Sequence, residues 1–245
     1  MGKRIAVLVG AALLLALALS IYDGLIQLNH PSKADHPIRG VDVSHYQGTI
    51  DWETLQEQGI RFAYIKATEG SSYVDGMFGR NWENIARTDL RYGAYHFFSF
   101  GSSGQTQAEN FCGTVRAAEG MLPPAVDVEP YGKYRSAEDL RNAQDELSAW
   151  LETVEARMGV RPIIYTTEDF YRECVSDSFP EHDIWIRSVY RSPSKDIAWT
   201  FWQYSNRFQL KGYSGEERFI DMNAFIGDVE AFEAYGLGRT DRSSD

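Results

Sequence analysis

The sequence predicts an α/β fold, a modified TIM-like β/α barrel with about five βα units followed by strands that lack regular helices. Two observations lead to this prediction. Short runs rich in β-branched residues alternate with helical segments over about 130 residues, a rhythm typical of parallel βαβ units. In the last third, the gaps between candidate strands are too short for crossover helices, which need about a dozen residues or more.

The elements are expected in a regular order from residue 38 onward. Strands are predicted at 38–44, 60–67, 92–100, 125–129 and 161–167, and helices at 51–59, 78–90, 103–120, 136–159 and 168–177. Asp51 is the expected N-cap of the first of these helices, and Gly59 is its expected end. Strands at 183–190, 198–205 and 218–225 then precede a closing helix over about 224–235.

The helix at 136–159 has the clearest signals. Ser136 with Asp139 resembles a capping box, and Gly159 follows the last apolar residue. One apolar face is predicted to pack on the sheet, and it consists of Leu140, Ala143, Leu147, Leu151, Val154 and Met158.

The N-terminal segment predicts export. Lys3 and Arg4 precede an apolar run over residues 5–19, the order typical of a secretory signal. Residues 1–22 are therefore interpreted as either a signal peptide, with a small-x-small site at Ala18 and Ser20, or a signal anchor that keeps residues 5–22 in the membrane. Both alternatives place the rest of the chain in the periplasm or outside the cell. Residues 23–37 are interpreted as a linker, 38–235 as the barrel domain and 236–245 as a polar tail.

Composition excludes some partners. The net charge of −11, without a basic stretch, argues against nucleic acid. The two cysteines, Cys112 and Cys174, permit a disulfide after export but do not predict one. Histidines are few and scattered and there is no CxxC pair, so neither a metal nor another cofactor is expected. We expect a monomer.

Four acidic residues lie in predicted strands or at their ends: Asp42, Asp127, Glu129 and Asp221. Each precedes or follows apolar residues, and because side chains alternate along a strand, the acids are expected to face the barrel interior. Carboxylates gathered at one face repel one another, which raises some pKa values and keeps a proton available for general acid catalysis. Lys66 and Arg187 are the cations expected to neutralise part of this charge.

Seven motifs occur in an order that resembles glycoside hydrolase family 25, the N-acetylmuramidase lysozymes: "GVDVSHYQG", "FAYIKATEG", "GAYHFF", "AVDVE", "PIIYT", "WTFWQYS" and "DMNAF". The resemblance covers about residues 38–232. It implies a barrel of the kind predicted above and hydrolysis of the β-1,4 bond between N-acetylmuramic acid and N-acetylglucosamine in bacterial peptidoglycan.

The resemblance also implies roles for individual residues. Glu129 matches the catalytic acid and Asp127 its partner, while Asp42 and Asp221 match the aspartates of the first and last barrel strands. Tyr95 and Tyr165 match positions that line the substrate groove. Gln203, which stands between two aromatic residues, is a further candidate for a polar contact with substrate. One departure from the family pattern is "WIRSVY", in which Arg187 replaces a small residue.

Several alternatives remain open from the sequence. Asp127 would orient the substrate's own acetamido group in a substrate-assisted route, whereas Asp42 or Asp221 would activate water in an inverting route. The same barrel would also suit a non-catalytic peptidoglycan-binding module, and four acids are also potential oxygen ligands of a divalent-metal hydrolase. A chitinase-type D-x-x-D-x-D-x-E motif is disfavoured because Pro123 and Pro124 precede the D-x-E residues.

Overall fold

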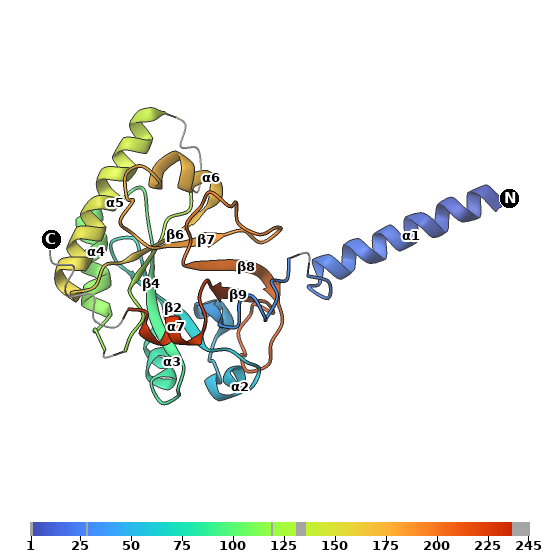
Figure 1. Ribbon diagram of the computed structural model, residues 1–245, viewed down its shortest axis with the longest axis horizontal. Coiled ribbons are helices and arrows are strands. Elements are labelled where there is room, and N and C mark those ends of the chain that lie inside the picture. Colours follow the sequence, from blue (N-terminus) through green and yellow to red (C-terminus); the bar gives the residue numbers. More distant parts are fainter. Residues whose placement is uncertain (1, 28, 119, 131–135, 237–245) are drawn as a thin grey trace.

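A computed structural model describes residues 2–27, 29–118, 120–130 and 136–236. Figure 1 shows a barrel of strands with helices packed around it and a long N-terminal helix that extends away from it. The predicted polar tail lies, apart from its first residue, outside the described residues.

The strands form a single sheet that closes on itself. Its order is β1-β9-β8-β7-β6-β5-β4-β2-β3, and β1 also pairs with β2, so every strand except β3 belongs to a closed barrel. The bounds are β1 Arg39–Val43, β2 Phe62–Glu69, β3 Tyr73–Val74, β4 Arg91–Phe97, β5 Ala125–Asp127, β6 Ile163–Thr167, β7 Ile184–Arg187, β8 Phe201–Phe208 and β9 Ile220–Phe225.

Strand direction follows the predicted rhythm. The strands from β1 to β8 in the barrel pair in parallel, whereas β9 runs antiparallel to both of its neighbours, β8 and β1. Five βα units come first, and their helical parts are α2 (Trp52–Glu57), α3 (Phe78–Ile85), α4 (Gly104–Thr114), α5 (Ala137–Met158) and α6 (Glu168–Phe170), which continues as the π-helix η2 (Tyr171–Val175). No helix separates β7, β8 and β9 in the described residues. The predicted fold class is confirmed.

Helix α5 matches its prediction closely. The Ser136 side chain accepts a hydrogen bond from Asp139 N, the Asp139 side chain reaches back to the Ser136 backbone, and Gly159 ends the helix at φ 70°. The predicted apolar face packs into the core, and it also includes the fully buried Trp150, which the periodicity had not singled out. A short 3-10 turn (η1, His45–Gln47) follows β1.

Some predicted bounds were wrong. The closing helix α7 spans Val229–Ala234 and starts later than expected, because Ala224 and Phe225 are still paired with neighbouring strands. Helices α3 and α4 end at Ile85 and Thr114, several residues before their expected ends. Strand β5 ends at Asp127, so Glu129 lies just beyond the strand instead of inside it.

Alternation along the strands separates two apolar layers. The outer layer, between barrel and helices, includes Val41, Val126, Val128 and Met222. The inner layer fills the barrel with large side chains, which include Phe62, Tyr64, Tyr165, Trp185, Phe201 and Phe225. Because neighbours in a strand point to opposite faces, the outward valines and methionine turn the adjacent acids inward, as predicted.

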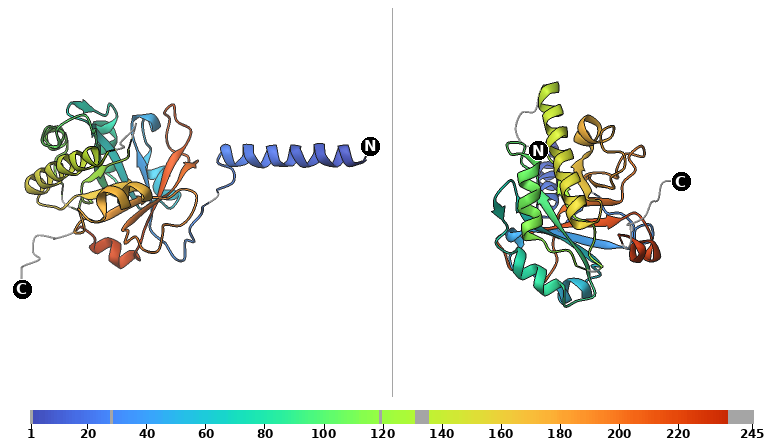
Figure 2. Two further views of the ribbon diagram at one scale, coloured as in Figure 1. Left: turned by 90° about the horizontal axis from the view of Figure 1, so that it is seen from above. Right: turned by 90° about the vertical axis from the view of Figure 1, so that its left-hand side faces the viewer.

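The N-terminal helix α1 (Gly2–Tyr22) stands apart from the barrel in all views (Figures 1 and 2). Its segment Lys3–Tyr22 is long and apolar enough to cross a membrane, a property shared by signal sequences. In the following segment, residues 23–27 and 29–37 are described; they form no regular helix or strand, yet they pack on the barrel. Asn29 donates to the carbonyls of Ser188 and Arg191, and Gln27 donates to that of Arg207.

Candidate active site

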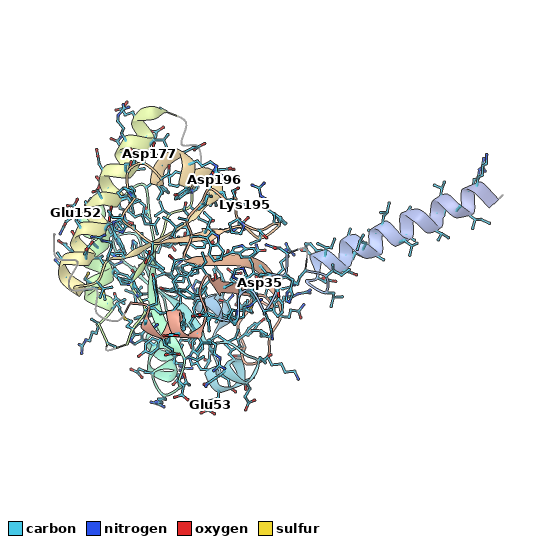
Figure 3. The ribbon with its side chains drawn as sticks, in the orientation of Figure 1. Asp35, Glu53, Glu152, Asp177, Lys195 and Asp196 are labelled. Atoms are coloured by element: carbon cyan, nitrogen blue, oxygen red, sulfur yellow. The ribbon has the colours of Figure 1, made fainter. Side chains whose placement is uncertain are left out.

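A cleft of about 410 Å³ opens at the carboxyl ends of the parallel strands, the end at which β/α barrels hold catalytic groups. Its wall combines acids, amides, aromatic rings and two cations. The lining residues are Asp42, Val43, Ser44, Tyr46, Gln47, Lys66, Tyr95, Phe97, Asp127, Glu129, Tyr165, Arg187, Gln203, Asn206, Glu217, Phe219 and Asp221. By contrast, Glu53 and Glu152, two of the charged residues labelled in Figure 3, lie at the periphery of the molecule.

Asp42 and Asp221 form one half of the acidic cluster. They are direct partners in the antiparallel register of β1 and β9. The Gln203 amide donates to both carboxylates, at 3.0 Å to Asp42 and 3.2 Å to Asp221. Asn223 Nδ2 also donates to Asp42, at 2.8 Å. These donors stabilise negative charge at Asp42 in particular.

Two aromatic residues hold these amides in place. The Tyr165 hydroxyl donates to Gln203 Oε1 at 2.9 Å, and Trp185 Nε1 donates to Asn223 Oδ1 at 2.8 Å. Each bond fixes the amide so that its NH₂ group points to the carboxylates. The inner layer of the barrel therefore orients the polar groups above it.

Burial governs the pKa values of this pair. Burial raises the pKa of Asp42, and the amide hydrogen bonds from Asn223 and Gln203 oppose that rise. The pKa of Asp221 lies well above its usual range, because of burial first and then the Asp42 charge. The pair therefore retains a proton more readily than two exposed carboxyls.

Asp127 and Glu129 form the other half, at the end of β5. Burial, the Glu129 charge and the Asp42 charge together raise the pKa of Asp127 well above its usual range, while Lys66 and Arg187 oppose the rise. Asp127 Oδ1 is buried and has no hydrogen-bond partner among the residues that the structure describes. It is therefore a free acceptor within the cleft.

Glu129 is the more accessible of the two acids, with its side chain about 31% exposed. Arg187 Nε lies 3.7 Å from Glu129 Oε1. Burial raises the pKa of Glu129 and Arg187 lowers it, with a net upward shift. Arg187 therefore neutralises part of the cluster, as expected. Lys66 forms its ion pair with Glu69, at 2.6 Å, but its charge also lowers the pKa of Asp127.

Comparison with known proteins decides the family. The model of Glycosyl hydrolases family 25 matches residues 41–213 of the chain. The chain belongs to this family. A solved family 25 glycosyl hydrolase from Bacillus anthracis is 46% identical, with a TM-score of 0.78 over 85% of this chain and 97% of that one.

Two curated relatives extend the comparison. Protein YegX of Escherichia coli K12 is 42% identical over 82% of this chain and 74% of its own length. Lysozyme M1 of Streptomyces globisporus is 34% identical over 78% of this chain and 69% of its own length. The chain is a glycoside hydrolase, the class that the acids and the family resemblance predicted, rather than a non-catalytic module.

The family 25 cleft contains every residue that the sequence predicted to act in catalysis or substrate binding. All four acids, Tyr95, Tyr165, Gln203 and Arg187 line it. Sequence reasoning missed Asn223, although its place two residues after Asp221 in "DMNAF" puts it on the same face of the strand as that acid. It also missed other residues that line the cleft and belong to no catalytic motif: Tyr46, Asn206, Glu217 and Phe219.

Other candidate groups lie outside this family 25 cleft. His96 is a fully buried histidine that is hydrogen-bonded to Thr68 and Gln107, and burial lowers its pKa to about 4, so it is a core residue. Cys112 and Cys174 are not bonded to each other. Among the described residues, no group of three or more His, Cys, Asp or Glu side chains has the geometry of a metal site.

Proposed function

We propose that this family 25 enzyme is a muramidase that hydrolyses the β-1,4 bond between N-acetylmuramic acid and N-acetylglucosamine in bacterial peptidoglycan. The observation that carries the proposal is the pair of partly exposed acids at the end of β5, Glu129 facing the cleft and Asp127 with a buried, unpaired Oδ1, in a cleft that holds two further carboxyls. Family membership and the similarity to Lysozyme M1 support the substrate class.

Glu129 is the proposed general acid. It is accessible to the glycosidic oxygen, and its raised pKa favours the protonated form that this role needs. It donates its proton to the leaving oxygen, and as a carboxylate it then takes a proton from the incoming water.

Asp127 is the proposed partner of the substrate's acetamido group. Its unpaired Oδ1 would accept a hydrogen bond from the acetamido N–H, which orients the acetamido oxygen to attack the anomeric carbon. That bond also favours the ionised form of Asp127. Because Asp127 and Glu129 compete for protons, ionised Asp127 leaves the proton on Glu129, where the leaving group needs it.

The remaining candidates have supporting roles in this scheme. Asp42 and Asp221 provide negative charge that stabilises the oxocarbenium-like transition state, and Gln203 holds them together. Tyr165 positions Gln203, and Tyr95 lines the sugar groove. An inverting route through Asp42 or Asp221 predicts the opposite anomer of the first-formed product, which NMR of fresh hydrolysate distinguishes.

The test is product analysis with the full-length chain in mild detergent, since residues 23–37 pack on the barrel and should not be removed. Digested peptidoglycan should release fragments that end in reducing N-acetylmuramic acid. Glu129→Gln should lower kcat by about 10²- to 10⁴-fold while the protein remains folded. Insensitivity to a chelator would argue against the divalent-metal alternative. Reducing N-acetylglucosamine ends would refute the proposed bond.

We also propose that helix α1 directs the enzyme out of the cytoplasm, as a cleaved signal peptide or as a retained anchor. The apolar Lys3–Tyr22 segment, none of which is buried against the barrel, supports both alternatives. Mass spectrometry of the chain recovered from membrane and soluble fractions distinguishes them: a retained N-terminus in the membrane fraction indicates an anchor, and a chain that starts at residue 21 indicates cleavage. An intact chain in the cytosol would refute export.

A further inference from the structure

A second pocket adjoins the catalytic cleft. It has a volume of about 310 Å³. On one side lie the end of β6 and the first residues of α6, and on the other side lies the loop that follows β7. Thr167, Glu168 and Asp169 form one wall and residues 187–191 form the other. Arg187 lines both this pocket and the cleft, so a ligand in the pocket would lie next to Glu129.

The pocket wall is built around Glu168. Its carboxylate accepts hydrogen bonds from Ser188 Oγ at 2.9 Å, Ser194 Oγ at 2.6 Å and Arg191 at 3.2 Å. These bonds tie the loop after β7 to the start of α6. Glu168 is buried and satisfied, so it serves as a structural group and adds little repulsion toward an anionic ligand.

The groups left available to a ligand are of a different kind. The Arg191 side chain pairs with Glu168 through one terminal nitrogen but is still 72% exposed, and Tyr190 is 75% exposed. Arg187 contacts Glu129 through Nε, and among the described residues no hydrogen bond occupies its terminal NH groups. Asp169 is an exposed acid at the edge, so the pocket offers two guanidinium groups, one aromatic face and one carboxylate.

We propose that this pocket binds the peptide stem of the substrate, with a stem carboxylate on Arg187. The inference rests on the proposed muramidase function. The peptide of peptidoglycan is attached to the lactyl group of N-acetylmuramic acid, the sugar whose bond is cleaved, so it must leave the cleft close to the four acids. Arginine suits this role because its planar fork of donors matches a carboxylate in a bidentate pair.

The test compares two forms of one substrate. Soluble, uncross-linked glycan chains that carry stem peptides are assayed before and after an N-acetylmuramyl-L-alanine amidase removes the peptides. The measured quantity is the ratio of kcat/KM for peptide-bearing chains to kcat/KM for stripped chains. A charge-assisted hydrogen bond to the stem should make this ratio roughly ten- to hundredfold for the full-length enzyme.

Two variants locate the effect in the pocket. Arg187→Gln removes the proposed carboxylate partner and should bring the ratio close to one. Tyr190→Ala removes an exposed ring that no core contact depends on, and it should lower the ratio without loss of folding. Arg161→Gln is the matched control: this arginine pairs with Glu155 before β6, at the opposite end of that strand from the pocket, and its ratio should equal that of the wild type.

The outcomes separate this inference from the function on which it rests. A wild-type ratio of one would refute the stem pocket while muramidase activity stands. An Arg187→Gln variant that loses the same factor on both substrates would also refute it, since Arg187 would then act only through Glu129. A wild type that releases no reducing N-acetylmuramic acid from either substrate would refute the muramidase function and the pocket together.

Discussion

The contact between Arg187 and Glu129 gives the most informative prediction about the acid cluster. Arg187→Gln removes a positive charge that lowers the pKa of all four acids. At the 3.7 Å separation of Nε and Oε1, Coulomb's law gives about 1 kcal/mol with the dielectric constant of water and about 4 kcal/mol with an effective value of 20.

The low end of this range is the relevant one. Both side chains are about 30% exposed, so solvent screens the interaction, and we expect about 1 kcal/mol. Loss of this energy destabilises the ionised acids, so their pKa values rise in the variant. Glu129, the proposed general acid, then keeps its proton to higher pH. Asp127, which must be ionised in the proposed scheme, also loses its proton only at higher pH.

The assay is the pH dependence of kcat, measured as release of reducing ends at saturating substrate. Both limbs of the profile should move to higher pH in Arg187→Gln, and the displacement should be larger at low salt than at high salt. The limbs report the cluster as a whole because its members titrate together. A profile that stays in place, or moves to lower pH, would show that Arg187 does not control these acids.

Three further predictions concern stability and geometry. Tyr165→Phe leaves Gln203 Oε1 without its hydrogen-bond donor, so the unfolding free energy, measured by denaturant titration, should fall by about 1–3 kcal/mol. The kcat for product release should also fall, and an unchanged kcat would contradict the role of Tyr165 in positioning Gln203. Asp127→Asn should raise Tm at pH 7 by roughly 2–4 °C for each kcal/mol of unfolding free energy recovered. The pKa of Asp127 is raised in the folded state, so its contribution to stability is fully present below the ordinary Asp pKa of about 3.9 and is lost as pH rises. The gain in Tm should therefore vanish near pH 3, and a variant that is less stable than the wild type at pH 7 would contradict this sign. Asn29→Ala removes one buried and one partly buried hydrogen bond to the loop after β7 and should cost about 1–3 kcal/mol of unfolding free energy, measured by thermal unfolding. Asp35→Ala, at an exposed position of the same segment, should cost nothing measurable.

The contacts of residues 23–37 with the barrel limit how far the barrel can move away from helix α1. The sequence predicts a linker there, but Gln27 and Asn29 bind barrel carbonyls. At the base of α1, Arg207 donates to the Tyr22 carbonyl. If α1 stays in the membrane, these contacts hold the barrel close to the bilayer instead of letting it move on a free tether.

Local patterns in the sequence determined much of the fold. Strand and helix alternation, the Ser136 cap and Gly159 are short-range signals, because they follow from side-chain periodicity and from backbone preferences of a few residues. The same alternation turns the four acids inward, since each neighbours an apolar side chain of the outer layer. The seven ordered motifs then pointed to the family and its acidic residues.

Only the tertiary structure decided the relations between distant residues. The bonds from Gln203 to Asp42 and Asp221, the approach of Arg187 to Glu129 and the sharing of Arg187 by two pockets all depend on barrel closure. Closure sets the register of β1 with β9, and no local preference encodes that register. Burial in the closed barrel also sets the pKa values, because the sequence identifies each acid but not how much water surrounds it.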